Sequence, residues 1–225
     1  MASYRIHFSK SGCLRYVSHL DVIRIFKRAF KRAGIQLAYS QGFNPHPKMG
    51  FAQPLALGYT GDDEVFAFDT LQSYQPEDIR QSLNRELPAG MDVSFCAPIE
   101  AGGKSLASMV CAAEYEIRFP LEGFGTGDPH RVRWNDFLQE AIMVPKKNKK
   151  TKSWEPVNIR PQIRQVTSAV QDDQFCVTVW LDAGSQSHLS PELVIPALMK
   201  FLDLPLERSD IEVTRLHIKF DKNTI

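Results

Sequence analysis

Long hydrophobic runs are missing from this sequence. None of its segments approaches the roughly 18 consecutive apolar residues that a membrane-spanning helix needs. The first ten residues, MASYRIHFSK, also lack the charged-then-apolar layout of a signal peptide. We therefore expect a protein that makes no membrane contact and works in the cytoplasm.

Cysteine is scarce and scattered. The four cysteines stand at 13, 96, 111 and 176, and none belongs to a C-x-x-C pair. A zinc ribbon or an iron–sulfur cluster needs closely spaced thiolates, so neither is written locally in the sequence. The pattern is typical of a reduced, cytoplasmic chain, and we predict no metal and no cofactor.

Acidic residues are rare at the start of the chain. The first 50 residues hold nine basic residues and one acid, Asp21, although the whole protein carries a net charge of only +1. A second basic cluster, KKNKKTK, begins at Lys146, and two arginines follow it. Such asymmetry predicts recognition of an anionic partner. Solvated helix faces and a mobile lysine loop are the alternative.

The basic residues at the start of the chain fall on one face of a predicted helix. Ser18 and Asp21 form an S-x-x-D capping signal, and Gly34 is a good residue to end a helix. At 100° per residue the apolar side chains share one side, and the opposite side is almost wholly cationic. Like charges four residues apart repel each other, so this face favours an anionic partner over simple solvation.

The order of predicted elements is the same in both halves of the chain. The first half reads as strands at 4–8, 51–59, 64–70 and 91–99 with helices at 18–33 and 76–87. The second reads as strands at 113–119, 157–170, 174–183 and 211–220 with helices at 131–142 and 190–204. Each half is βαββαβ. We predict an α+β protein of two tandem ferredoxin-like sandwiches, at 1–101 and 112–225, joined by a linker at 102–110.

Two histidines are weak catalytic candidates. His19 lies in the first turn of the basic helix, and His46 lies in the loop after it. An imidazole at a helix N-terminus titrates near neutral pH and is suited to act as a general base. Capping of the helix by Ser18 and Asp21 explains the same motif without catalysis. No third ligand accompanies the two histidines, so no metal site is predicted.

The loop YSQGFNPHPKMGF follows the basic helix. Two prolines fix φ within it, so it presents its side chains at low entropic cost. Its aromatic residues are suited to stacking on bases and its lysine to meeting a phosphate. The alternative is a structural connection with Phe43 in the core. The full set of residues predicted to contact RNA is Arg15, Arg24, Lys27, Arg28, Lys31, Arg32, Tyr39, Phe43, His46, Lys48, Lys146, Lys147, Lys149, Lys150, Arg160 and Arg164. The last two lie four apart, on the same side of a strand if the strand continues past Pro161.

Residues 12–59, GCLRYVSHLDVIRIFKRAFKRAGIQLAYSQGFNPHPKMGFAQPLALGY, resemble the opening signature of the radical-SAM-linked family of unknown function. The segments NIRPQIRQV and DAGSQSHLSPELVIPAL resemble its second region. The resemblance implies a radical SAM protein as partner. This chain lacks the three-cysteine cluster motif, so it is not itself the radical SAM enzyme. The predicted architecture is also similar to the tandem ferredoxin-like RNA-processing proteins of CRISPR systems.

These observations lead to three functional hypotheses. The first is a non-catalytic RNA-binding or substrate-presenting accessory protein that acts with a radical SAM enzyme. The second is a metal-independent endoribonuclease with His19 or His46 as general base. The third is a protein-interaction subunit that binds no RNA and whose basic face docks on an acidic surface of the radical SAM enzyme.

Overall fold

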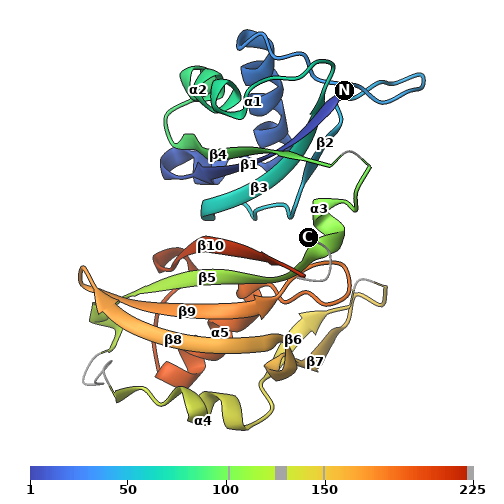
Figure 1. The fold of residues 1–225 in the computed structure, drawn as a ribbon. Helices are drawn as coiled ribbons and strands as arrows, with labels where there is room; N and C mark the ends of the chain where they lie inside the picture. Colours follow the sequence, from blue (N-terminus) through green and yellow to red (C-terminus); the bar gives the residue numbers. More distant parts are fainter. Residues whose placement is uncertain (101, 125–130, 149, 222–225) are drawn as a thin grey trace. The chain divides into compact units, whose positions relative to one another are not determined.

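The computed structural model describes residues 1–100, 102–124, 131–148 and 150–221 (Figure 1). The chain forms two compact units. Unit 1 comprises Met1–Val110 with Arg215–Ile225, and unit 2 comprises Cys111–Thr214. The division into folding domains at 1–101 and 112–225 stays a prediction. No helix among the described residues is long and apolar enough to cross a membrane.

Unit 1 has the ferredoxin-like order of elements. These are β1 (Ala2–Lys10), α1 (His19–Arg32), β2 (Met49–Phe51), β3 (Thr60–Thr70), α2 (Pro76–Glu86), β4 (Met91–Ile99) and the short α3 (Leu106–Met109). β1 lies between β4 and β3, β2 pairs with β3, and all three pairings are antiparallel. This is the split βαβ arrangement that the sequence predicts for the first half.

The core of unit 1 lies between its sheet and its two helices. Figure 1 shows α1 and α2 on the same face of β4, β1 and β3. Alternate residues of the strands point to that face, and aromatic rings fill the layer. Phe26 of α1 contacts Phe66 of β3 with ring centroids 4.6 Å apart, and Phe30 contacts Phe68 at the same distance. Burial of each such ring contributes about 1.5–3 kcal/mol, so α1 is held firmly by its apolar face.

Both ends of α1 are capped as the sequence predicts. The Ser18 hydroxyl accepts a hydrogen bond from the Asp21 N–H at 3.2 Å and donates one to the Asp21 carboxylate at 2.7 Å. At the other end, Gly34 adopts φ +71°, which a residue with a side chain rarely adopts. Ile35 N–H then donates to the Phe30 carbonyl at 3.0 Å, and Gly34 N–H donates to that of Lys31. This is a Schellman ending, and it turns the following segment back along the helix.

Unit 2 also consists of antiparallel strands and helices. Its elements are β5 (Val110–Pro120), α4 (Trp134–Gln139), β6 (Met143–Lys147), β7 (Trp154–Asn158), β8 (Ile163–Gln171), β9 (Gln174–Asp182), α5 (Pro191–Leu202) and β10 (Glu212–Phe220). β9 lies between β5 and β8, and β6 pairs with β7 as a separate hairpin. The first residue of β5 and the last six of β10 belong to unit 1. The α+β class and the ferredoxin-like units are thus as predicted.

Several predicted boundaries in unit 1 are wrong. The strand expected at 51–59 ends at Phe51, because the proline and glycine that follow favour turns. Residues 60–63, which separate the two predicted strands, are instead the start of β3, where the chain pairs with β1. Alternation alone did not reveal this part of β3, because its residues are mostly polar. The predicted linker at 102–110 contains α3, with Ser105 as its N-cap.

Two predicted boundaries in unit 2 are also wrong. The helix expected at 131–142 is only the six residues of α4, since β6 begins at Met143. The strand expected at 157–170 is interrupted by a 3-10 turn at Arg160–Gln162, and β8 begins after it. Pro161 has no N–H for a sheet hydrogen bond, which explains the break. The lysine cluster therefore lies on and beside the β6–β7 hairpin.

Candidate nucleic-acid interface

The basic face of α1 is divided between paired and unpaired cations. Arg24 donates a hydrogen bond to the Asp21 carboxylate at 2.6 Å, and Arg32 Nε donates to Glu86 of α2 at 2.7 Å. Lys27, Arg28 and Lys31 make no ion pair or hydrogen bond through their side chains with any residue that the structure describes. These three are therefore the cations of α1 that are available to a ligand.

The three available cations line a common groove. The groove has a volume of about 730 Å³ and runs between α1 and the segment after its Schellman ending. Its other walls include Tyr39 and Leu71, whose side chains are exposed, and none of the described residues that line it is acidic. A groove with three unpaired positive charges attracts a polyanion, and its exposed aromatic ring favours a polyanion whose planar rings can stack on it. Stabilisation of the helix C-terminus by Lys31 is the structural alternative for that residue alone.

The loop that follows forms a projecting arm, residues 38–48. Its root is a ladder of main-chain hydrogen bonds: Ala38 N–H donates to Asp69 O at 2.8 Å, Asp69 N–H to Lys48 O at 3.0 Å and Lys48 N–H to Ala38 O at 2.8 Å. Further out, Ser40 N–H donates to His46 O at 2.9 Å. The arm is thus an extension of the unit 1 sheet with Tyr39 at its base beside the groove.

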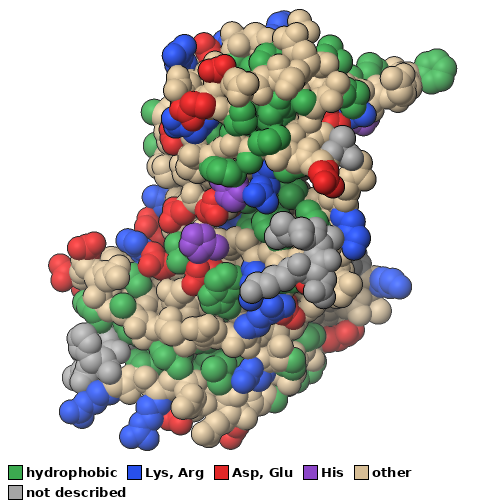
Figure 2. Space-filling view, in the orientation of Figure 1, with side chains coloured by type: hydrophobic (Ala, Val, Ile, Leu, Met, Phe, Trp, Pro, Cys, Tyr) green, Lys and Arg blue, Asp and Glu red, His purple; other side chains and the backbone are tan. Residues whose placement is uncertain are grey.

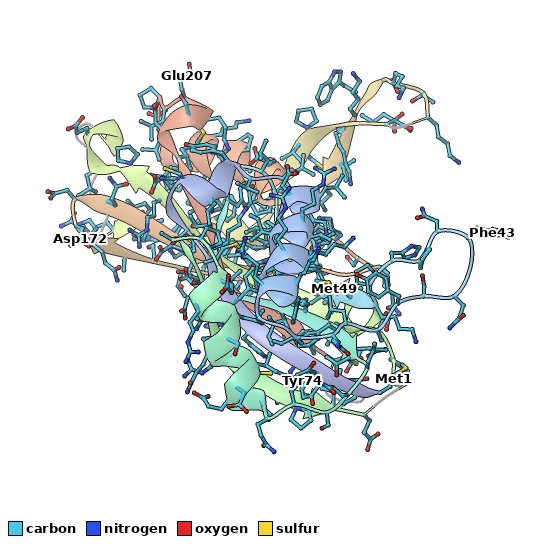
Figure 3. All side chains as sticks on the ribbon, turned by 90° about the horizontal axis from the view of Figure 1, so that it is seen from above. Met1, Phe43, Met49, Tyr74, Asp172 and Glu207 are labelled. Carbon is cyan, nitrogen blue, oxygen red and sulfur yellow. The ribbon has the colours of Figure 1, made fainter. Side chains whose placement is uncertain are left out.

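The tip of the arm carries an exposed aromatic ring. Gly42 adopts φ +120°, which makes the turn. Phe43 has a relative exposure of 111 %, so the alternative that places it in the core is wrong. Figure 3 shows Phe43 at the far end of the arm, and the same protrusion ends in hydrophobic atoms in Figure 2. An exposed ring on a stiffened arm is available for stacking, so Phe43 stays a candidate contact residue.

The two other predicted arm residues have partners inside the chain. The His46 ring is exposed, and its Nδ1 lies 2.8 Å from the Asn44 carbonyl. Lys48 Nζ lies 3.9 Å from a carboxylate oxygen of Asp69, a long and half-exposed ion pair. Lys48 therefore remains able to turn toward a ligand at small cost.

Arg15 does not line the groove. It belongs to a 3-10 turn, Gly12–Tyr16, and its guanidinium lies 5.6 Å from the Tyr16 ring centroid. Its carbonyl accepts a hydrogen bond from Gly58 N–H. Sequence proximity to the basic helix thus did not bring this arginine to the basic groove.

The lysine cluster forms an aromatic and basic hairpin in unit 2. Lys147 pairs across the strands with Trp154, whose side chain is 67 % exposed, and Lys146 pairs with Glu155. Lys150 N–H donates to the Asn148 side chain in the turn. Lys149 lies outside the described residues. The exposed tryptophan beside lysines makes this hairpin a second candidate contact.

The strand does not continue past Pro161, so the condition for placing Arg160 and Arg164 on one strand face is not met. Arg160 lies in the 3-10 turn before β8, where its guanidinium donates to the carbonyls of Leu138 and Ile163. Arg164 donates to the Asp182 carboxylate at 2.7 Å and to the Cys111 carbonyl. Both guanidinium groups hold parts of unit 2 together through these hydrogen bonds, and their contact with RNA stays a prediction.

The two histidines are not assembled as a catalytic pair. His19 packs its ring edge-on against Phe51, with centroids 4.9 Å apart, and lines a small cavity beside Lys10 and Glu64. Burial lowers the pKa of His19 below its usual value. His46 is not among the described residues that line this cavity. In the described part of the chain, no cluster of three or more His, Cys, Asp or Glu side chains is suited to a metal.

A buried ion pair beside this cavity was missed in the sequence. Arg215 of β10 donates from Nε to Glu64 Oε1 at 2.8 Å and from Nη2 to Glu64 Oε2 at 2.5 Å, and both residues belong to unit 1. The two residues are 151 positions apart. The sequence offered one signal of this pair. Both residues lie in predicted strands, and a buried charged residue in a strand is unusual unless it is paired.

The sequence matches one known protein family over most of its length. Residues 3–191 match the family described as "Uncharacterized protein conserved in bacteria (DUF2344)". The chain belongs to that family. No curated protein matches the chain.

Solved structures resemble the chain only distantly. A crystal structure of a Cbf5-Nop10-Gar1 complex matches with 11 % identity and a TM-score of 0.44, and the match covers 97 % of this chain and 50 % of that one. The DUF2344 chain thus spans about half the length of that relative. An unknown protein from Galdieria sulphuraria matches with 11 % identity and a TM-score of 0.28, over 98 % of both chains.

Proposed function

We propose that this DUF2344 protein is a non-catalytic, single-stranded RNA-binding accessory protein. The observation that carries the proposal is the groove of unit 1. Lys27, Arg28 and Lys31 form no ion pair with a described residue, and the described residues that line the groove include no acid. The phosphates of an RNA strand follow these cations, and release of counterions supplies most of the affinity.

The aromatic residues favour a single strand over a duplex. Tyr39 stands at the groove wall, and Phe43 stands at the tip of the arm that leaves it. In a single strand the bases are free to stack on exposed rings, whereas in an A-form duplex they are stacked on each other and inaccessible. Backbone contact in the groove and base stacking on the arm then belong to one binding mode.

The radical SAM partner is part of this proposal and rests on the resemblance of the sequence motifs. The chain has no cysteine motif for an iron–sulfur cluster, so the radical SAM chemistry belongs to the partner. The DUF2344 protein holds the RNA and presents it to that enzyme. Co-purification of the two proteins that persists after nuclease treatment supports a direct contact. Loss of the enzyme on nuclease treatment means that RNA alone joins them.

The binding test compares three versions of the full chain. The groove variant carries Lys27→Gln, Arg28→Gln and Lys31→Gln, and the control variant carries Arg85→Gln, Lys104→Gln and Lys200→Gln. The control removes the same charge from exposed positions outside the groove. Fluorescence anisotropy with a labelled random-sequence 15-nucleotide RNA at 50 mM salt measures each Kd. We expect the groove variant to bind at least tenfold more weakly and the control to bind like the wild type. No binding by the wild type, or equal loss in both variants, overturns the proposal.

A further inference from the structure

The β6–β7 hairpin of unit 2 is anchored at its root. Its two strands form a sheet of their own, as Figure 1 shows. At the root, Ile159 N–H donates to the Ile142 carbonyl at 2.9 Å, and Ile142 N–H donates to the Asn158 side chain at 3.0 Å. Ile159 and Val144 are buried, and β6 packs against α5. The hairpin is therefore fixed to the rest of unit 2 at its base.

Asn148 shapes the turn that joins the two strands. Its N–H donates to the Ser153 carbonyl at 2.8 Å, and its carbonyl accepts a hydrogen bond from the Lys152 N–H at 2.9 Å. Its side-chain oxygen accepts another from the Lys150 N–H at 2.9 Å. Its side-chain amide donates to the Glu155 carboxylate at 3.1 Å. Hydrogen bonds of the main chain thus fix the backbone from which Lys150 and Lys152 project.

The described residues of the hairpin carry four exposed lysines and one acid. The lysines are Lys146, Lys147, Lys150 and Lys152. None of them forms an ion pair or a side-chain hydrogen bond with a described residue. The acid, Glu155, accepts hydrogen bonds from the Asn148 amide and from the Ser153 hydroxyl, the latter at 3.0 Å. Neutral groups thus satisfy the carboxylate, and the hairpin has three positive charges in excess, which attract a polyanion.

One face of the hairpin combines a lysine with an exposed aromatic ring. Lys147 and Trp154 are directly opposite in the register, so their side chains share a face. The exposed Pro145 and Pro156 are paired two residues further along on the same face. The Trp154 side chain is 67 % exposed and is therefore available for stacking. A planar ring with an ammonium group beside it is the combination that binds a base and its phosphate in single-stranded nucleic acids.

We propose that the β6–β7 hairpin is a second contact for single-stranded RNA, in which Trp154 stacks on a base and the four lysines meet the neighbouring phosphates. The proposal rests on the RNA-binding function proposed above, but it uses none of the groove residues. A duplex is a poor ligand, because its bases are stacked on one another and cannot lie on Trp154. An acidic protein segment would meet the lysines but offers no base, so the two kinds of partner are separable by experiment.

The first experiment repeats the anisotropy assay with the same 15-nucleotide RNA at 50 mM salt. The hairpin variant carries Lys146→Gln, Lys147→Gln and Lys150→Gln, and the control variant defined above loses the same charge elsewhere. We expect the hairpin variant to bind about fivefold or more weakly than the control variant, because phosphate contacts are lost. Equal Kd values for these two variants overturn the proposal.

Two substitutions test the stacking of Trp154 by itself. Trp154→Ala keeps every lysine and removes the ring, and we expect it to bind RNA about fivefold or more weakly than the wild type. Trp154→Phe keeps a ring and should bind like the wild type. A loss in the hairpin variant with Trp154→Ala unaffected leaves only attraction between charges and overturns the stacking contact. Equal affinity for a labelled polyglutamate peptide of 15 residues assigns the lysines to an acidic protein and also overturns it.

The hairpin and the groove fail separately in this assay. A loss in the hairpin variant, with the groove variant binding like the wild type, supports the hairpin and overturns the groove. The reverse pattern supports the groove and overturns the hairpin. No binding by the wild type overturns both.

A second measurement locates the RNA on the wild type without any substitution in the hairpin. RNA that contains 4-thiouridine is cross-linked to the full chain with ultraviolet light, and the tryptic peptides are analysed by mass spectrometry. We expect cross-links on the peptide that contains Trp154, in the wild type and in the groove variant alike. Cross-links confined to peptides of unit 1 contradict the hairpin contact.

Discussion

Arg215 and Glu64 form a two-point ion pair that is almost wholly buried within unit 1, with N···O distances of 2.8 and 2.5 Å. Arg215 also donates to the Gln53 carbonyl at 2.8 Å. The guanidinium thus ties the last strand of the chain to β3 and to the segment that leaves β2. Neither charge has access to water, so each depends on the other.

We expect Arg215→Met or Glu64→Gln alone to lower the free energy of unfolding by about 3–5 kcal/mol, because each leaves an uncompensated buried group. The double variant is expected to lose much less than the sum of the two. Urea denaturation of all four proteins measures the coupling. Strictly additive losses would show that the pair does not act as a unit.

The salt dependence of RNA binding tests the groove separately from affinity. Each phosphate neutralised by a single-stranded ligand contributes about 0.7 to the slope of log K against log salt. The groove variant loses three cations, so its slope should be smaller than that of the wild type by about 2. Anisotropy titrations between 50 and 200 mM salt give both slopes, and an unchanged slope would place the phosphate contacts elsewhere.

Phe43→Ala is expected to weaken RNA binding about 5- to 150-fold, the loss of one stacked base at about 1–3 kcal/mol. The Tm should not change, because the ring is fully exposed and packs on nothing. Phe43→Trp, which keeps a ring at the tip, should bind like the wild type. Equal Kd values for the wild type and Phe43→Ala would remove the arm tip from the interface.

Acid stability should depend on Asp63. The hydrogen bond from His7 at 2.6 Å, with a further contribution from His217, holds the pKa of Asp63 below its usual value of 3.8. Its contribution to stability is thus fully present above pH 3.8 and is lost as the pH falls through the lower folded-state value.

Asp63→Asn should therefore be less stable than the wild type at pH 6, and the difference should shrink as the pH falls below 3.8. Urea midpoints between pH 2 and 6 measure this. Asp78→Asn, which removes an exposed carboxylate of α2, is the matched control. A gap between wild type and Asp63→Asn that stays constant down to pH 2 would contradict the assignment.

The sequence predicted the features that depend on neighbouring residues. The two faces of α1, its Ser18 cap and its Gly34 ending follow from helical periodicity and capping rules, and all are present. The arm was predicted from its prolines. Which cations stay unpaired was not predictable, because Arg32 is neutralised by Glu86 from another helix.

Features that depend on distant residues escaped prediction. The cavity beside His19 is lined by residues from three strands, and Glu64 in its wall pairs with Arg215, which lies 151 positions away in the sequence. Arg160 and Arg164 looked alike in the sequence, but Pro161 breaks the strand and sends their side chains to different carbonyls. Leu71 joined the groove only because the segment after α1 pairs with the end of β3.

The hydrogen-bonded root of the arm has a mechanical consequence. Asp69 bonds both sides of the arm through its main chain, and its carboxylate accepts a hydrogen bond from Ser3 of β1 at 2.7 Å. A force applied to Phe43 is therefore transmitted through Asp69 to two paired strands of the sheet, because the root of the arm is hydrogen-bonded to them. Tension in an RNA strand bound at the tip of the arm would act in this way on the core of unit 1.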